Sequence, residues 1–178
     1  KSFETYAPID GDDSSLPSAA VMAIEPDPND PSTLWIGTWD GGVSAFDTRT
    51  GHMRTIDLPD ERIYTMRFDR RGRLWVGTWG GGLMLVDTQT GTVRRFEYDK
   101  PNQIPHAVVY SLCQDDSGIM WIGTNGGGVA KFVDHHNRYE FIVHDPGDAG
   151  SLPAGKVYAL AESPDGSIWC GIYSGGLC

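Results

Sequence analysis

The sequence has few of the residues that would commit it to a metal, a membrane or a nucleic acid. Only three cysteines occur in 178 residues, without a Cys-x-x-Cys pair or a Cys/His spacing typical of zinc. No apolar run approaches the length of about 18 residues that a transmembrane helix needs, so none is expected. Lysine and arginine total 14 against 24 acidic residues, which gives a net charge of −10. This balance argues against nucleic acid and against an anionic membrane surface as partners.

The sequence is rich in glycine and aromatic residues, and they recur in a repeat. There are 23 glycines, and aromatic residues make up 11% of the chain. The phrase Leu-Trp-Ile-Gly-Thr at 34–38 returns, with small changes, at 74–78, 120–124 and 168–172. A period of about 40–50 residues, made of short apolar runs and glycine turns, predicts the blades of a β-propeller. The tryptophans that mark the period are Trp35, Trp75, Trp121 and Trp169.

Each unit has the pattern of four short antiparallel strands joined by tight turns. In the first unit the strands are expected at 21–24, 34–38, 43–47 and 53–58, with glycine pairs and Asp-Thr-x-Thr-Gly tips between them. Second strands carry apolar residues at neighbouring positions, as expected for sheets that are covered on both faces. We therefore expect an all-β chain that forms a single β-propeller segment over residues 1–178.

Three complete blades are expected at 16–58, 59–99 and 100–145, followed by an incomplete blade at 146–178. Residues 1–15 are expected to supply the outer strand of a preceding blade, at Phe3–Ala7, and a linker. Propellers usually contain about 4–8 blades, so the predicted ring is incomplete. Two alternatives remain: a longer protein supplies the missing blades, or two chains pair so that their interrupted blades complement each other. No signal peptide opens the sequence, and we expect the chain to be a piece of a longer protein.

The pattern between Ser151 and Leu177 carries a family resemblance. It reads Ser-Leu-Pro-x-x-x-Val-Tyr-x-Leu, then Asp-Gly-x-Ile-Trp-x-Gly-x-x-x-Gly-Gly-Leu, and it resembles the two-component regulator propeller repeat. The other units match it in the same way, so the resemblance covers essentially the whole chain. The fourth unit departs from the pattern, with Cys170 in place of Ile/Val and Ile172 in place of Thr.

The resemblance carries functional expectations. In that family such repeats form the extracytoplasmic sensor region of hybrid histidine kinases and of some diguanylate cyclases. It therefore implies a periplasmic, non-catalytic input module for a small ligand, frequently a carbohydrate. The signalling domains would lie elsewhere in a parent chain, because this segment contains none of their motifs.

Aromatic, basic and amide residues are predicted to gather at one end of the propeller axis. The turn after each second strand places one residue there, and three of the four first strands place a tyrosine at their second position. Such platforms suit stacking on sugar faces, with polar groups that orient hydroxyls or a carboxylate. In the alternative interpretation, the tyrosines pack between blades and the basic residues are solvated or paired with acids. The predicted ligand-binding residues are Trp39, Trp79, Asn125, Tyr173, Tyr64, Tyr110, Tyr158, Arg62 and Lys156.

Other candidate groups are expected to be structural. The four tryptophans of the repeat phrase are expected in the core, as are Cys113 and Cys170. The pair His135-His136 and the acidic stretches 10–13 and 27–30 are expected to be solvated turns, so neither a metal nor a cofactor is predicted. No catalytic residue is predicted. The acids at the ends of first strands are expected away from the aromatic end: Glu25, Asp69, Asp115 and Glu162.

Three classes of function follow from the sequence. A ligand-sensing module is favoured, a scaffold for protein interaction or self-association is the main alternative, and a propeller glycoside hydrolase or lyase is the third. A hydrolase would need two carboxyl groups that face the channel a few ångströms apart. The fold alone does not choose among these classes.

Overall fold

The structure is a computed structural model that describes residues 2–98, 100, 103–133 and 138–178. The described residues contain strands and turns but no helix that is long and apolar enough to cross a membrane. The strands form three four-stranded antiparallel sheets and one three-stranded sheet, each a meander in chain order. They are β1 (Val21–Pro26), β2 (Thr33–Thr38), β3 (Val43–Asp47), β4 (Met53–Ile56), β5 (Ile63–Phe68), β6 (Leu74–Thr78), β7 (Leu83–Val86), β8 (Val93–Phe96), β9 (Val109–Gln114), β10 (Met120–Thr124), β11 (Val129–Val133), β12 (Arg138–Ile142), β13 (Lys156–Glu162), β14 (Ile168–Tyr173) and β15 (Gly176–Leu177).

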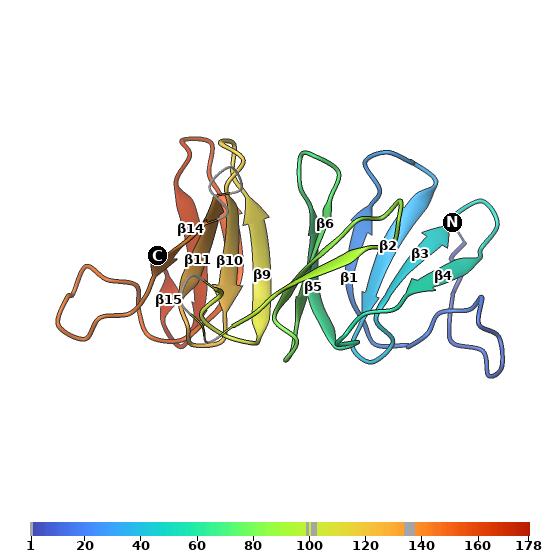
Figure 1. Cartoon of the computed structure of the whole chain (residues 1–178), viewed down its shortest axis with the longest axis horizontal. Helices are drawn as coiled ribbons and strands as arrows, with labels where there is room; N and C mark the ends of the chain where they lie inside the picture. Colours follow the sequence, from blue (N-terminus) through green and yellow to red (C-terminus); the bar gives the residue numbers. More distant parts are fainter. Residues whose placement is uncertain (1, 99, 101–102, 134–137) are drawn as a thin grey trace.

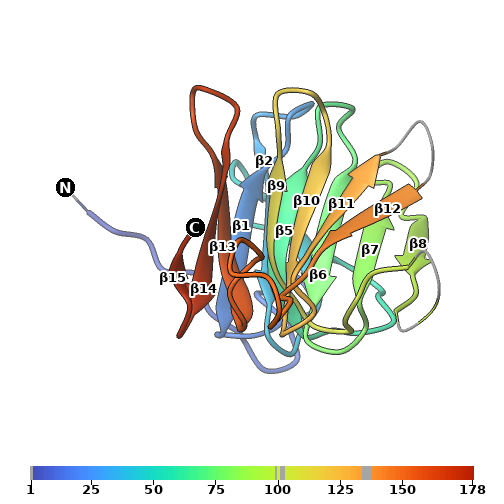
Figure 2. The same ribbon diagram turned by 90° about the vertical axis from the view of Figure 1, so that its left-hand side faces the viewer.

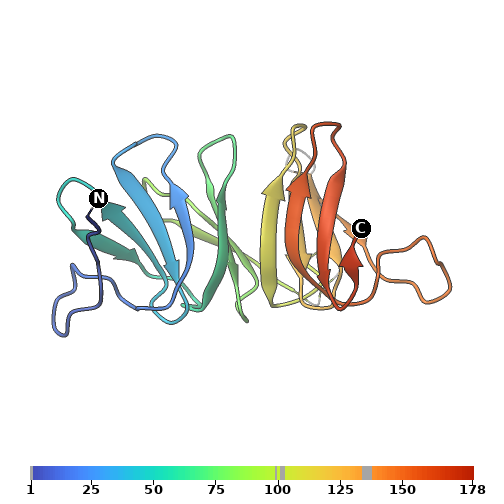
Figure 3. The same cartoon turned by 180° about the vertical axis from the view of Figure 1, so that it is seen from behind.

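The four sheets are blades that stand side by side about a common axis (Figures 1 and 3). The first strands are neighbours: β1 packs against β5, β5 against β9, and β9 against β13. Later strands lead outward, and Figure 2 shows β8 and β12 on the side of the molecule away from β1 and β13. β1 and β13 do not pack together as neighbouring first strands do, so the arc is open. The predicted all-β, incomplete propeller of four-stranded antiparallel blades is confirmed.

Neighbouring blades approach each other most closely at the glycine of the repeat phrase. A Cβ on Gly37 of the first blade (β1–β4) would lie 2.6 Å from Cγ2 of Ile63 in the second blade (β5–β8). A Cβ on Gly77 would lie 2.7 Å from Cγ1 of Val109 in the third blade (β9–β12). Only glycine leaves room for the next first strand at this point. The repeat of the glycine therefore reflects the contact between blades.

The first three tryptophans of the repeat phrase, of which Trp35 and Trp75 are buried and Trp121 is partly buried, are each tied to an aspartate that follows the first strand. The indole Nε1 donates to Asp27 from Trp35 (2.9 Å), to Asp69 from Trp75 (3.0 Å) and to Asp115 from Trp121 (2.6 Å). The expectation that Asp27 is a solvated turn acid is wrong, because its side chain is buried by this contact. In the fourth blade (β13–β15) Ser163 stands six residues before Trp169, as Asp69 stands before Trp75, so that blade has a hydroxyl in place of the carboxylate.

Two further expectations are corrected by the structure. Residues 3–7 contain no strand, because no described strand lies alongside them to share hydrogen bonds; the ring of Tyr6 packs edge-on against Phe46 instead, with centroids 4.7 Å apart. Trp169 was expected in the core but is 45% exposed, because no further blade covers its face of the fourth blade. The pair His135-His136 lies outside the described residues. Within the described residues, no group of three or more His, Cys, Asp or Glu side chains could hold a metal ion.

Candidate functional site

Every first strand contains a β-bulge near its start. Ile63 pairs with Thr78 and Thr65 pairs with Gly77, which leaves Tyr64 unpaired between them. A bulge changes the direction of a side chain and is frequent next to binding sites. The bulge recurs in all four first strands, so the same backbone irregularity presents one side chain from each blade. The bulged residues are Met22, Tyr64, Tyr110 and Tyr158.

The turn after each second strand is held beside the start of the first strand of its own blade. The backbone N–H of Trp39 donates to the carbonyl of Ala20 (2.9 Å), and the N–H of Trp79 donates to the carbonyl of Arg62 (2.9 Å). In the third blade the backbone N–H of Asn125 donates to the carbonyl of the residue just before β9. In the fourth blade Tyr173 pairs with Lys156 across the sheet. The turn residue and the bulged residue of each blade therefore come together.

A buried hydroxyl closes each of the first three turns. Oγ1 of Thr38 donates to the carbonyl of Gly42, and Thr78 and Thr124 make the same bond at 3.0 and 2.9 Å. Gly42 has a φ of 68°, a conformation that favours glycine. Ile172 lacks the hydroxyl in the fourth blade, where Ser174 adopts a φ of 64°.

The predicted aromatic residues form one continuous cluster of six rings, which we call the aromatic cluster. Trp39 lies 5.3 Å from Trp79, and Trp79 stacks on Tyr64 at 6.1 Å, measured between ring centroids. Tyr64 lies 4.7 Å from Tyr110, and Tyr110 lies 4.3 Å from Tyr158. Tyr173 completes the series at 5.8 Å from Tyr158. The cluster crosses all four blades at one end of the first strands.

The six rings differ in how far solvent reaches them. Tyr173 is 63% exposed and Tyr158 is 38% exposed, whereas Trp39, Trp79 and Tyr64 are half-buried. Tyr110 is only 3% exposed, so the interpretation of packing between blades holds for its ring. The cluster thus contains one buried ring, that of Tyr110, and five rings that solvent reaches to different extents.

The hydroxyl of Tyr110 is a polar group without a hydrogen bond inside this cluster. It is buried, and no hydrogen-bond partner for it exists among the described residues. Burial raises the pKa of the Tyr110 phenol, and the neighbouring Tyr158 adds to the shift. An unpaired buried hydroxyl costs free energy, on the order of 1–3 kcal/mol.

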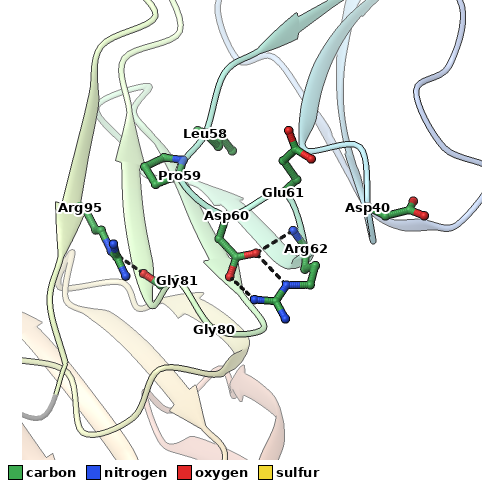
Figure 4. A pocket seen from close by; sticks show the side chains of 9 residues that line it. All are labelled: Asp40, Leu58, Pro59, Asp60, Glu61, Arg62, Gly80, Gly81 and Arg95. Carbon is green, nitrogen blue, oxygen red and sulfur yellow. Dashed lines mark hydrogen bonds and ion pairs between the residues drawn. The ribbon is translucent and has the colours of Figure 1, made fainter.

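A depression of about 520 Å³ adjoins the aromatic cluster between the first two blades (Figure 4). Asp60 stands in its wall and accepts from Nε of Arg62 at 3.0 Å, from Nη2 at 3.2 Å and from the backbone N–H at 3.1 Å. Asp40, Glu61 and Arg95 line the same depression, and Nε of Arg95 donates to the Gly81 carbonyl. Burial alone would raise the pKa of Asp60, but the bonds from Arg62 outweigh it and the pKa lies below its usual value.

The two basic residues of the prediction have different surroundings. Arg62 is paired with Asp60, as the alternative interpretation expects, yet its side chain is still half-exposed beside the cluster. Lys156 places Nζ 5.9 Å from the ring centroid of Tyr173, a cation–π contact at the fourth blade. The backbones of Asn125 and Lys156 form an isolated bridge between the third and fourth blades. All nine predicted residues therefore lie at the same end of the propeller axis.

The strand-end acids that the sequence singled out are engaged in structural contacts at the other end of the first strands. Asp69 and Asp115 hold the tryptophans, as described above. Glu25 pairs with Arg67 at 3.7 Å, and the carboxylate of Glu162 accepts from the backbone N–H of Asp116. Burial raises the pKa of Glu25, which the charge of Arg67 partly opposes.

Three features of the site were missed by sequence reasoning: the bulges, the place of Met22 in the bulged series, and the acidic depression. The only available signal for the bulges was a large residue followed by a small one, as in Tyr64-Thr65, Tyr110-Ser111 and Tyr158-Ala159. Asp60 stands two residues before Arg62, a spacing that allows the bidentate pair but does not require it.

Two segments of the chain match a known repeat family. A family model described as "Two component regulator propeller" matches residues 57–80 and 103–126. Each matched segment contains a first strand, a second strand and the turn residue of the site, Trp79 or Asn125. The two matched segments, in the second and third blades, are therefore similar to the two-component regulator propeller repeat.

Solved structures with the same fold include extracellular domains. The extracellular domain of BT4673, a proposed hybrid two component system from B. thetaiotaomicron, has a TM-score of 0.78 and 21% identity, over 95% of this chain and 22% of that one. The extracellular domain of the proposed hybrid two component system BT3049, from the same organism, has a TM-score of 0.69 and 22% identity, over 99% of this chain and 28% of that one.

An enzyme also has this fold. Virginiamycin B lyase from Staphylococcus aureus has a TM-score of 0.63 and 16% identity, over 89% of this chain and 54% of that one. At these identities the likeness is one of fold. The chain spans about a quarter of the length of the two extracellular domains. Among curated proteins, no sequence matches the chain.

Proposed function

We propose that this propeller segment binds a small carbohydrate at the aromatic cluster without transforming it. The observation that carries the proposal is the contact series of six rings from Trp39 to Tyr173, placed at one end of the axis by repeated bulges. Aromatic faces suit the apolar faces of sugar rings, and Trp39, Trp79, Tyr158 and Tyr173 leave part of their rings open to solvent. Arg62 and Lys156 flank the rings and can orient polar substituents.

We further propose that the segment belongs to the extracytoplasmic input region of a two-component or cyclic-dinucleotide signalling protein. The family of the repeat supports this role, and so does the fold shared with extracellular domains of proposed hybrid two component systems. The kinase or cyclase output would belong to other domains of a longer chain. A ligand would then act by changing how the blades pack, since the cluster spans all four of them.

Calorimetric titration with short oligosaccharides of glucose, xylose, arabinose and galacturonate tests the proposal. We expect the binding sugar to lose about tenfold to a hundredfold in affinity on Trp39→Ala or Trp79→Ala, because each change removes an aromatic face worth about 1.5–3 kcal/mol. Trp169→Ala is the matched control, since Trp169 is an exposed tryptophan that has no ring contact with the cluster. We expect it to bind as the wild type does.

Chromatography of the same mixtures separates a sensor from an enzyme. The proposal expects every sugar to be recovered intact after prolonged incubation. Release of shorter sugars would show a hydrolase or lyase. Unchanged binding by both cluster variants, or a loss confined to Trp169→Ala, would place the ligand elsewhere.

A further inference from the structure

Two of the three cysteines lie opposite each other in the fourth blade. Cys170 lies in β14, and Cys178 directly follows β15. The backbone N–H of Cys170 donates to the carbonyl of Cys178 at 2.7 Å, and the N–H of Cys178 donates to the carbonyl of Cys170 at 3.1 Å. Residues that exchange both bonds in an antiparallel sheet have Cα atoms about 5.5 Å apart. A disulfide joins Cα atoms about 4.4–6.8 Å apart, so the backbone already has the required spacing.

The two cysteine side chains also leave the sheet on the same face. Directly opposite residues of an antiparallel pair present their side chains to the same side. Sγ of Cys178 donates to the backbone carbonyl of Cys170 at 3.7 Å. Burial raises the pKa of the Cys170 thiol to about 11, and the neighbouring Cys178 adds to the shift. The thiols are therefore neighbours that a change of side-chain rotamer can bring into bonding contact.

The register of the repeat brings these two positions together in every blade. In the first three blades the same two positions pair across the second and third strands, and none of them holds a cysteine. Only the fourth blade thus has a thiol at both positions. The equivalent pairs are Ile36 with Ser44, Val76 with Met84, and Ile122 with Ala130.

The hairpin between the two cysteines lacks the hydroxyl that closes the equivalent turns. A threonine closes each of the first three turns, whereas Ile172 holds that position in the fourth blade. The N–H of Gly175 donates to the carbonyl of Ile172 at 3.0 Å, and Ser174 adopts a φ of 64°. Tyr173, the most exposed ring of the aromatic cluster, lies in this hairpin. A covalent link across the base of the hairpin would restrict its opening.

We propose that Cys170 and Cys178 form a disulfide that closes the β14–β15 hairpin under oxidising conditions. The thiolate of Cys178 attacks a disulfide oxidant such as oxidised glutathione, which gives a mixed disulfide and releases one glutathione thiolate. The thiolate of Cys170 then attacks the sulfur of Cys178, which forms the protein disulfide and releases the second glutathione thiolate. The two protein thiols lose two protons and two electrons, and the oxidant is reduced to two thiols.

The disulfide agrees with the compartment of the proposed function. Disulfides form and persist outside the cytoplasm, in oxidising compartments such as the periplasm. This biological setting rests on the proposed function, whereas the pairing of the thiols does not. In that setting the bond would fix the hairpin that presents Tyr173 to the ligand.

Counting thiols in the unfolded protein tests the proposal without any ligand. The folded chain is incubated with oxidised glutathione, and the oxidant is removed before the chain is unfolded. We expect one free thiol of the three, and a mass about 2 Da below that of the reduced chain. The tryptic peptide 157–178 contains Cys170 and Cys178 but not Cys113, so it should carry the whole mass change. Three free thiols, a lasting glutathione adduct on this peptide, or a disulfide between two chains would overturn the proposal.

Single substitutions identify the two partners. We expect Cys178→Ser to show no loss of mass after the same treatment, because Cys170 then has no partner thiol. Cys170→Val places the residue of the second blade at this position and should give the same result. Cys113→Ser is the matched control, since Cys113 lies in the third blade opposite Trp121, and it should form the disulfide in full. A disulfide in Cys178→Ser, or its absence in Cys113→Ser, would show that Cys113 is a partner and would overturn the proposed pair.

Hydrogen exchange measures what the bond does to the hairpin. We expect the amide of Gly175 to exchange at least tenfold more slowly in the oxidised chain than in the reduced chain, because the link limits local opening. The amide of Gly82 is the control, since its turn in the second blade is closed by Thr78 and should exchange equally in both states. Equal rates at Gly175 would overturn the proposed closure of the hairpin. Because no sugar is present, failure of the proposed ligand site would leave the thiol and exchange results unchanged.

Discussion

Replacing Asp69 by alanine removes the acceptor at the centre of the second blade. Its carboxylate is buried and accepts from the indole Nε1 of Trp75 at 3.0 Å, from Nε of Arg73 at 2.7 Å, and from the backbone N–H groups of Arg71 and Arg73 at 2.9 and 3.0 Å. These bonds tie the turn between β5 and β6 to the ring that packs against the third blade. The variant therefore tests why an aspartate precedes each of the first three repeat tryptophans.

The size of the loss follows from which donors water can reach. Trp75 is fully buried, so its indole N–H would be left without an acceptor, at a cost of about 1–3 kcal/mol. The side chain of Arg73 is partly exposed and can be rehydrated, so it adds less. With the two turn N–H groups included, we expect Asp69→Ala to lower the free energy of unfolding by about 3 kcal/mol. Asp69→Asn keeps one acceptor oxygen, and we expect a smaller loss.

Urea unfolding followed by tryptophan fluorescence measures this difference. With a slope of about 2 kcal/mol per molar urea, the midpoint of Asp69→Ala should fall by about 1.5 M. Ser163→Ala is the matched control, because Ser163 holds the same position before the exposed Trp169 and should change the midpoint by less than about 0.5 M. Equal shifts for the two variants, or no shift for Asp69→Ala, would refute the structural role assigned to the carboxylate.

Two other predictions concern buried hydroxyls. Burial raises the pKa of Tyr110 and Tyr139 above the usual 10.0, so the stability gained by keeping them neutral is complete below pH 10 and is lost as the pH rises towards their raised pKa values. Absorbance at 295 nm should therefore show both tyrosines ionising only as the fold opens. Ionisation of every tyrosine near pH 10 with an unchanged circular dichroism spectrum would contradict this prediction. Thr78→Val removes the buried hydroxyl that closes the turn at Gly82 and should cost about 1 kcal/mol in urea unfolding, whereas a variant as stable as the wild type would show that the hydrogen bond contributes nothing net.

The sequence was sufficient for the architecture because the repeat encodes contacts that every blade shares. The glycine of each phrase marks the approach of the next first strand, as at Gly37 and Gly77, and the tryptophan marks the second strand. These features recur with a period, so they can be recognised without coordinates. The gathering of the candidate residues was predictable for the same reason, since equivalent positions in different blades lie at the same end of the axis.

The parts that could not be predicted depend on neighbours and on backbone register. Trp169 belongs to the same phrase as the buried Trp35, but its burial requires a blade beyond the fourth. Phe3 lies in a segment with the sequence of an outer strand, yet a strand requires a hydrogen-bonding partner. The bulge at Tyr64 is a shift in pairing between two strands, and a single sequence does not fix such a shift.

The most direct test of the account is a two-dimensional nitrogen–proton spectrum of the six indole groups during titration with the oligosaccharides named above. If the aromatic cluster is the binding site, the indole signals of Trp39 and Trp79 move with a common affinity, while those of Trp35 and Trp75 stay in place. Movement of the Trp169 signal with Trp39 and Trp79 unchanged would contradict the proposed site. Unchanged spectra with every sugar would contradict carbohydrate binding by this segment.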